Sequence, residues 1–200
     1  MDPVIAAQMM EGDGQEFLGG VSAEATVMFT DVRGFTTITE EYGAQGTVSF
    51  LNDYFSLMVD CISKEGGMLD KFIGDAIMAC FGLPMPHDDD PDRAMRASIG
   101  MIQTLWAWNQ TRLTKGLKTV DMGIGLNTDM VVSGNIGSPK RMDYTLIGDG
   151  VNLAARLESA CKSYAARILV SDATVQKLKG TYRMRAVDLV VVKGKTQPVK

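Results

Sequence analysis

The chain has 200 residues and a mass of 21.7 kDa, with 46% hydrophobic and 22% charged side chains. This composition excludes a disordered or fibrous protein, and a chain of this length can bury a core without disulfides or metals. With 20 basic and 24 acidic residues the net charge is −4, so the surface as a whole attracts neither nucleic acid nor an anionic membrane. We therefore expect no nucleic-acid partner.

Residues 3–10 predict a short helix that leads into a glycine-bearing linker. We interpret residues 1–22 as the remnant of an upstream segment, and expect a sensory or regulatory domain in a longer protein. No apolar run approaches the roughly 20 residues that span a bilayer, and the N-terminus does not have the pattern of a signal peptide. We expect a cytoplasmic protein without a membrane segment.

The remaining elements follow from apolar periodicity and turn residues. Alternation of apolar residues with polar residues and glycines over 120–127 predicts a half-buried strand, followed after a tight bend by a second strand. Asp90 and Pro91 predict a helix start, with Asp90 as N-cap. In chain order, the predicted strands cover residues 25–29, 68–71, 76–81, 120–127, 130–133 and 142–147, and helices follow residues 34, 90 and 150.

This order, β-α-β-β-α-β with extra C-terminal strands, predicts an α+β fold with a ferredoxin-like core. Such a core has one antiparallel-rich sheet with helices on a face. No linker-like stretch divides the chain after residue 20, so we expect residues 23–200 to form a single domain.

Cysteine and histidine are few and poorly spaced for metal or hydrolase chemistry. Cys61, Cys80 and Cys161 lie in apolar stretches, which favours buried free thiols in a reducing compartment. The single histidine, His87, stands in a polar run and is predicted to be a solvated loop residue. A histidine-based zinc site or a Ser-His-Asp hydrolase therefore has almost no residues to use.

Two carboxylates are the first candidates for chemistry. Asp31 follows the first strand, and Asp75 lies in the turn of a later hairpin that can pair beside that strand. Two carboxylates, completed by carbonyls, water and phosphate oxygens, are a usual way to hold magnesium. Taken singly, Asp31 could instead cap the next helix, and Asp75 could simply serve a Gly-Asp turn.

Two helix segments could bind phosphate groups. Gly34, Phe35 and Thr36 open a helix whose free N–H groups and positive dipole end suit a triphosphate. Asn152 and Arg156 are four residues apart on one helix face, where they could hold charge that develops on a phosphoryl group. The alternative is a surface asparagine and a salt-bridging arginine.

Together these segments resemble the class III nucleotidyl cyclases, and most closely the bacterial and cyanobacterial adenylate cyclases. The resemblance covers residues 24 to 198 and rests on three motifs in the right order. These are Phe-Thr-Asp-Val-Arg-Gly-Phe-Thr at 29–36, Asp-Lys-Phe-Ile-Gly-Asp-Ala-Ile-Met-Ala at 70–79 and Gly-Asp-Gly-Val-Asn-Leu-Ala-Ala-Arg-Leu at 148–157.

The resemblance implies a head-to-tail homodimer that converts ATP to cyclic AMP and pyrophosphate in the cleft between chains. It implies two divalent ions, Mg²⁺ or Mn²⁺, held by Asp31, Asp75 and the carbonyl of Val32. One ion activates the ribose 3′-hydroxyl, and the other grips the β- and γ-phosphates. It further implies that Asn152 and Arg156 of the partner chain act on the ribose and the α-phosphate. The family's phosphate-binding lysine near the C-terminus corresponds to Lys193.

The resemblance also implies which residues select the base. Lys71 matches a position that is lysine in adenylate cyclases and glutamate in guanylate cyclases, and its ammonium can donate to adenine N1. Thr145 falls on the second selective position, where its hydroxyl can accept from the adenine amino group. Because threonine can also donate to guanine O6, Lys71 is the residue expected to distinguish adenine from guanine.

The chain departs from the family at one position, Gly123, where many relatives have an arginine that binds the pyrophosphate end. Arg33 or Lys195 are candidates to compensate for it. Two alternatives to an adenylate cyclase remain open at this point. One is a guanylate cyclase, and the other is a catalytically silent cyclase-like module that dimerises or binds nucleotide as a regulator.

Overall fold

The computed structural model describes residues 20–138 and 140–188. The predicted helix over residues 3–10, Lys193 and Lys195 lie outside the described residues. No helix in the part that the structure describes has the length and apolar character required to cross a membrane.

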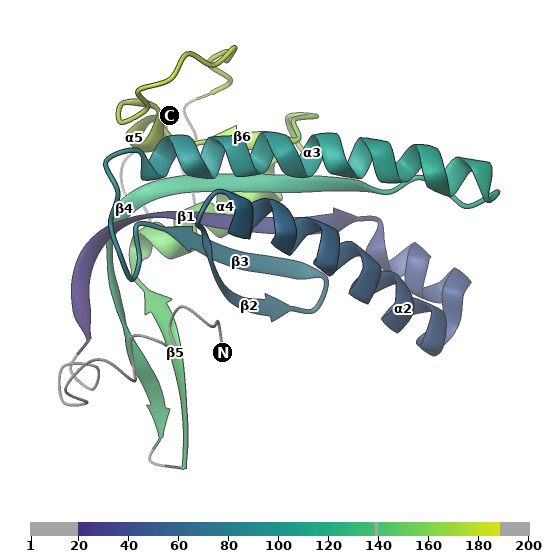
Figure 1. Ribbon diagram of the computed structural model, residues 1–200, viewed down its shortest axis with the longest axis horizontal. Coiled ribbons are helices and arrows are strands. Elements are labelled where there is room, and N and C mark those ends of the chain that lie inside the picture. The colour runs from purple at the N-terminus through teal and green to yellow at the C-terminus, as the bar shows by residue number, and fades with distance from the viewer. Residues whose placement is uncertain (1–19, 139, 189–200) are drawn as a thin grey trace.

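One mixed sheet organises the described chain, with strand order β2-β3-β1-β4-β5 and β6 paired to β4 off this path (Figure 1). The first strand is central, and every pairing is antiparallel except that of β4 with β6. The strands are β1 (Val21–Arg33), β2 (Met68–Ile73), β3 (Ala76–Phe81), β4 (Asp121–Ser138), β5 (Arg141–Ile147) and β6 (Ile168–Val170).

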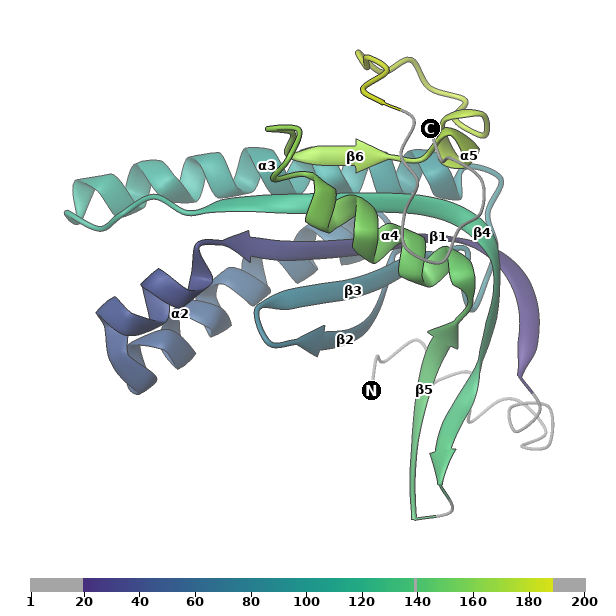
Figure 2. The same cartoon turned by 180° about the vertical axis from the view of Figure 1, so that it is seen from behind.

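Helices cover both faces of this sheet rather than one. The helices are α2 (Phe35–Lys64), α3 (Asp90–Thr114), α4 (Asp149–Ala160) and α5 (Asp172–Val175). Met28 and Val32 of β1 belong to the core that α2 and α3 cover, whereas Ala25 and Val27 belong to a second core that includes residues of α4. Figures 1 and 2 show α4 on the opposite side of the sheet from α2 and α3. The expectation of helices on a single face was therefore incomplete, and α4 is the addition to the ferredoxin-like core.

The prediction of two strands separated by a bend between residues 120 and 133 was wrong. β4 is continuous, because β1 pairs with it from Val21 opposite Ser133 to Arg33 opposite Asp121. This long ladder outweighs the turn preference of Asn127-Thr128-Asp129.

The strand is also not half-buried. Met122, Ile124 and Leu126 face the α2/α3 core, whereas Gly123 and Gly125 lie under α4 and are equally buried.

Two helix boundaries differ from the sequence pattern. The N-cap of α3 is Asp89, one residue before the predicted Asp90. The Asp90 carboxylate instead accepts the backbone N–H of His87 at 2.7 Å, so its hydrogen bond is to the loop before the helix. α2 starts at Phe35, directly after Gly34, but is kinked at Gly43, where φ is 65°.

The structure agrees with free thiols and with an exposed histidine in the described residues. All three thiols are free, and Cys80 and Cys161 are buried while Cys61 is partly buried. His87 is exposed in the loop before α3.

Glycine at position 125 lets α4 approach β4 closely. A Cβ on Gly125 would lie 2.2 Å from the carbonyl oxygen of Ala154 and 2.3 Å from the amide nitrogen of Glu158, both on the helix backbone. Gly125→Ala is therefore expected to lower the free energy of unfolding by about 3 kcal/mol, since overpacking against backbone cannot relax by a rotamer change. Gly100→Ala in α3, where a Cβ meets nothing within 4 Å, is the matched control. Urea unfolding of both variants measures the difference, and equal stabilities would contradict this packing.

Candidate active site

The structure brings Asp31 and Asp75 together at one end of the sheet. Asp31 lies near the end of β1, and Asp75 lies in the turn between β2 and β3. The Asp75 Oδ2 accepts the backbone N–H of Val32, the residue after Asp31, at 3.3 Å. The Asp31 carboxylate is also close enough to raise the pKa of Asp75. The predicted neighbourhood of the two carboxylates across adjacent strands is therefore correct.

Within the described residues, the acidic groups around Asp31 have raised pKa values. Burial, together with the neighbouring Asp31 carboxylate, raises the pKa of Asp75 to about 6. Glu158 of α4 lies close by, and burial followed by the charge of Asp31 raises its pKa to about 7. Burial and the charge of Asp31 thus outweigh the opposing charge of Arg33 at Glu158.

The donor chemistry of this pair fits a hard divalent cation. Magnesium prefers a few carboxylate oxygens and completes its shell with water and substrate phosphate. Within residues 20–138 and 140–188, no three His, Cys, Asp or Glu side chains converge as a ready-made metal site. The protein donors are thus limited to the pair and neighbouring backbone, which suits an ion that arrives with its nucleotide.

The N-terminal end of α2 follows this pair along the chain. Gly34 is its N-cap, and no side chain in the described residues caps the helix at that position. Gly34 and Thr36 are exposed and Phe35 is partly buried. The N–H of Thr37 is bonded to the Gly34 carbonyl, whereas no side chain in the described residues caps the start of the helix, so the N–H groups before Thr37 are available for an anion.

Asn152 and Arg156 lie on α4 with the spacing that the sequence predicted. Asn152 is exposed, and its side-chain amide donates to the carbonyl of Gly148 at 3.4 Å. The Nη1 of Arg156 is buried and has no hydrogen-bond partner among the described residues. In that part of the chain no hydrogen bond or ion pair joins Asn152 or Arg156 to Asp31 or Asp75. The salt-bridged surface arginine considered as an alternative is therefore not what the structure contains.

The two residues expected to select the base are connected through a third. Thr145 of β5 donates its hydroxyl proton to Asp70 Oδ2 of β2 at 3.0 Å. The Lys71 ammonium lies 3.5 Å from the same oxygen. Lys71 and Thr145 thus belong to one polar cluster.

Arg33 does not serve as the free cation that could replace an arginine at Gly123. Its Nη1 lies 3.3 Å from Asp121 Oδ2, and its Nη2 donates to the carbonyl of Ala166. At Gly123 itself, a Cβ would lie 2.5 Å from the Glu158 carboxylate. In the described chain the position of the relatives' arginine is therefore occupied by an acidic side chain from α4.

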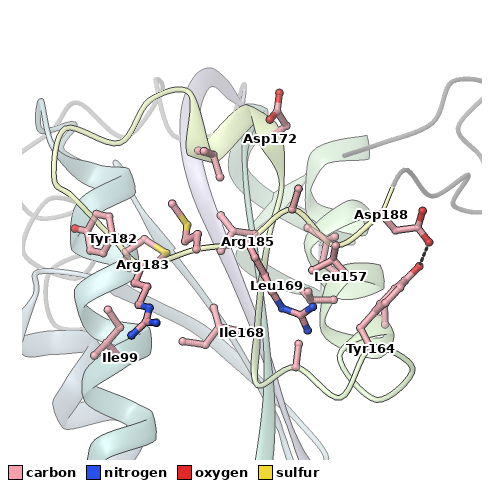
Figure 3. Close-up of a pocket in the computed structure, with 18 residues that line it drawn as sticks. Ile99, Leu157, Tyr164, Ile168, Leu169, Asp172, Tyr182, Arg183, Arg185 and Asp188 are labelled. Carbon is pink, nitrogen blue, oxygen red and sulfur yellow. Dashed lines mark hydrogen bonds between the residues drawn. The ribbon is translucent and has the colours of Figure 1, made fainter.

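The described chain also contains a cavity of about 610 Å³ that is separate from these residues (Figure 3). It lies between α3, α4, β6 and the segment over residues 182–188, and a hydrogen bond of 2.8 Å from the Tyr164 hydroxyl to Asp188 closes one side. None of the predicted site residues lines it. We therefore do not assign the active site to this cavity, although it is large.

Comparisons with known proteins agree with the motifs. Residues 21–200 match the family described as the adenylate and guanylate cyclase catalytic domain. An adenylate cyclase of Anabaena cylindrica is 38% identical over 87% of this chain and 35% of its own length. The adenylyl cyclase CyaB from P. aeruginosa superposes with a TM-score of 0.84 at 36% identity, over 91% of this chain and 93% of that chain. The guanylyl cyclase Cya2 superposes with a TM-score of 0.82 at 37% identity, over 91% of each chain.

The chain therefore belongs to the family of adenylate and guanylate cyclase catalytic domains. This confirms the resemblance and the fold class predicted from the sequence. The chain spans between 9% and 35% of the length of three adenylate cyclases that it matches. Because adenylyl and guanylyl cyclases both occur among its structural neighbours, the choice of nucleotide has to come from the site.

Sequence reasoning missed two acidic residues of this region. Glu158 was not predicted to belong to the site, although α4 places it near Asp31. Asp70 was read as part of a motif and given no role. Nothing in the sequence pattern indicates that Glu158 lies near Asp31 or that Asp70 contacts Thr145.

Proposed function

We propose that this chain is an adenylate cyclase, which converts ATP to 3′,5′-cyclic AMP and pyrophosphate. The observation that carries the proposal is the hydrogen bond from the Val32 N–H to Asp75, which brings Asp75 next to Asp31, where burial and the Asp31 carboxylate raise the pKa of Asp75. The proposed active site lies between two chains of a head-to-tail homodimer. Regulation by an upstream domain stays a prediction.

Two divalent ions, Mg²⁺ or Mn²⁺, bound there would activate the ribose 3′-hydroxyl and neutralise charge on the departing pyrophosphate. Asp31, Asp75 and the carbonyl of Val32 would hold these ions. The free N–H groups from Gly34 to Thr36 would bind phosphate oxygens, and Lys193 would add a further positive charge.

The partner chain would supply Asn152 and Arg156. The exposed Asn152 amide would orient the ribose. The Arg156 guanidinium would stabilise the charge that develops on the α-phosphate during in-line displacement. Its unpartnered buried Nη1 supports this role, because an arginine that serves only the fold would have satisfied its donors.

Preference for adenine rests on Lys71. An ammonium donates to the acceptor N1 of adenine but faces an N–H donor at guanine N1. Polar mismatches of this kind discriminate strongly, because they leave a desolvated charge unpaired.

Lys71→Glu is expected to lower kcat/KM for ATP about a hundredfold or more and to raise the relative use of GTP, since a carboxylate accepts from guanine N1–H and the 2-amino group. The measurement is the ratio of kcat/KM for ATP and GTP, with the products identified by chromatography. Lys64→Glu, at the exposed end of α2, makes the same charge change away from the site and should leave the ratio unaltered.

A parent protein that forms cyclic GMP faster than cyclic AMP would overturn the adenylate cyclase assignment. That second candidate has one supporting observation, the 37% identity to the guanylyl cyclase Cya2. A silent regulatory module is disfavoured because both metal carboxylates and the Asn152–Arg156 pair are present.

A further inference from the structure

Asp70 joins two strands from opposite ends of the sheet order. β2 and β5 are the two ends of the path β2-β3-β1-β4-β5. Even so, the Asp70 carboxylate accepts the Thr145 hydroxyl at 3.0 Å, with Lys71 at 3.5 Å. The Asp70 side chain is completely buried, at 0% exposed, whereas that of Lys71 is 38% exposed. A buried acid thus lies behind the two residues expected to select the base.

A backbone irregularity accompanies Asp70 at this position. In the pairing of β2 with β3, Leu69 is opposite Ala79 and Lys71 is opposite Met78, so Asp70 is an extra residue without a partner. This is a β-bulge, a feature that re-aims side chains and is common beside active sites.

The hydrogen-bond chemistry of this cluster has a definite polarity. A threonine hydroxyl has one proton to donate, whereas an ionised carboxylate can only accept. Once Thr145 donates its proton to Asp70, the Thr145 hydroxyl oxygen has only lone pairs to offer to a base. Lys71, with three donors, can contact Asp70 and still donate elsewhere. The cluster therefore offers a base one donor, the Lys71 ammonium, and one acceptor, the Thr145 oxygen, in fixed positions.

We propose that Asp70 is a positioning residue that fixes the Thr145 hydroxyl as a hydrogen-bond acceptor and thereby makes the site select adenine. The inference rests on the proposed function and deepens it. Adenine offers an acceptor at N1 and a donor at its 6-amino group, which complement Lys71 and Thr145. Guanine offers the reverse at N1 and O6. A free threonine hydroxyl could bind either base, and Asp70 restricts it to accepting a hydrogen bond from adenine.

The state of the Asp70 carboxylate agrees with this role. Burial raises its pKa, while the charge of Lys71 and the hydrogen bond from Thr145 act in the opposite direction. Its second oxygen, Oδ1, is buried without a partner among the described residues. An unpaired buried oxygen lowers stability, so packing alone does not account for an aspartate here.

The test replaces Asp70 with its neutral isostere. In Asp70→Asn the amide can donate to Thr145, which frees the hydroxyl proton for guanine O6. We expect the ATP/GTP ratio of kcat/KM to fall about tenfold or more while Lys71 is unchanged. Asp143→Asn removes another negative charge that acts on Asp70 and should keep the parental ratio.

A double-mutant cycle separates positioning from a structural effect. Thr145→Val should also lower the ratio, and Asp70→Asn added to it should change the ratio no further, because Asp70 acts through the hydroxyl. Thr145→Ser keeps the hydroxyl and should retain the preference. If Asp70→Asn does not fold, Thr145→Val and Thr145→Ser still test the inference. An unchanged ratio in Thr145→Val overturns it.

Equal losses with both nucleotides, or an unchanged ratio in folded Asp70→Asn, would also overturn it. Failure of the proposed function has a different signature, because the parent itself would then prefer GTP or form no cyclic nucleotide. For a parent that forms none, the relative Kd of 3′-deoxy-ATP and 3′-deoxy-GTP replaces turnover in the same set of variants. An Asp70→Asn variant with parental relative affinities in that measurement would rule out the positioning role.

Discussion

Alanine in place of Asp31 or Asp75 is expected to lower kcat by about a thousandfold. Each carboxylate would hold cations that stabilise the attacking and the leaving oxygen, and losing several kcal/mol of that stabilisation gives an effect of this order. Asp88→Ala, in the exposed loop before α3, is the control for loss of one acidic side chain. A folded variant that retains more than a tenth of parental turnover would contradict the two-metal assignment.

An asparagine variant of Asp75 should separate activity from stability. The raised pKa of Asp75, about 6, means that its ionised form is disfavoured in the folded chain. Its contribution to stability is present at low pH and is lost as the pH rises through that value. At neutral pH and without metal, Asp75→Asn should therefore be at least as stable as the parent. Mn²⁺ together with 3′-deoxy-ATP should raise the Tm of the parent but not the Tm of Asp75→Asn. A thermal scan of both proteins measures the difference.

The second large effect is recovery of activity by mixing two inactive variants. Asp31→Ala and Asn152→Ala are each expected to be inactive, because every cleft of either homodimer contains a lesion. In a mixed dimer one cleft takes Asp31 from one chain and Asn152 from the other, and is intact. With random mixing and independent clefts, about a quarter of parental activity should return.

A matched mixture tests this division of labour. Asp31→Ala mixed with Asp75→Ala should stay inactive, because each cleft takes both carboxylates from a single chain and therefore always contains one of the two lesions. Recovery in that control, or no recovery in the first mixture despite heterodimers seen by native mass spectrometry, would mean that the site is not divided between chains as proposed.

The sequence was sufficient for the parts of the site that depend on strand ends. Asp31 follows an apolar run and Asp75 lies in a Gly-Asp turn, and antiparallel pairing of the two strands brings them together. Arg156 and Asn152 share a helix face by spacing alone. These features are local, or follow from a single strand pairing.

Contacts that depend on the path of the whole sheet could not be predicted. The turn-like residues around Asp129 suggested a break, but pairing with the 13-residue β1 keeps β4 continuous. The bulge at Asp70 and its bond to Thr145 arise only when β5 comes near β2, 75 positions apart in the chain. The glycines opposite α4 looked like a solvated face, because a missing side chain gives no sign of what covers it.

The close seating of α4 has a consequence for control of the enzyme. At Gly123, Gly125 and Gly150 there is no room for even a methyl group between the helix and its neighbours. The helix with Asn152 and Arg156 and the sheet with Asp31 therefore form one stiff body within a chain. In the proposed dimer, we therefore expect a regulatory signal to move one whole subunit against the other rather than to bend either subunit.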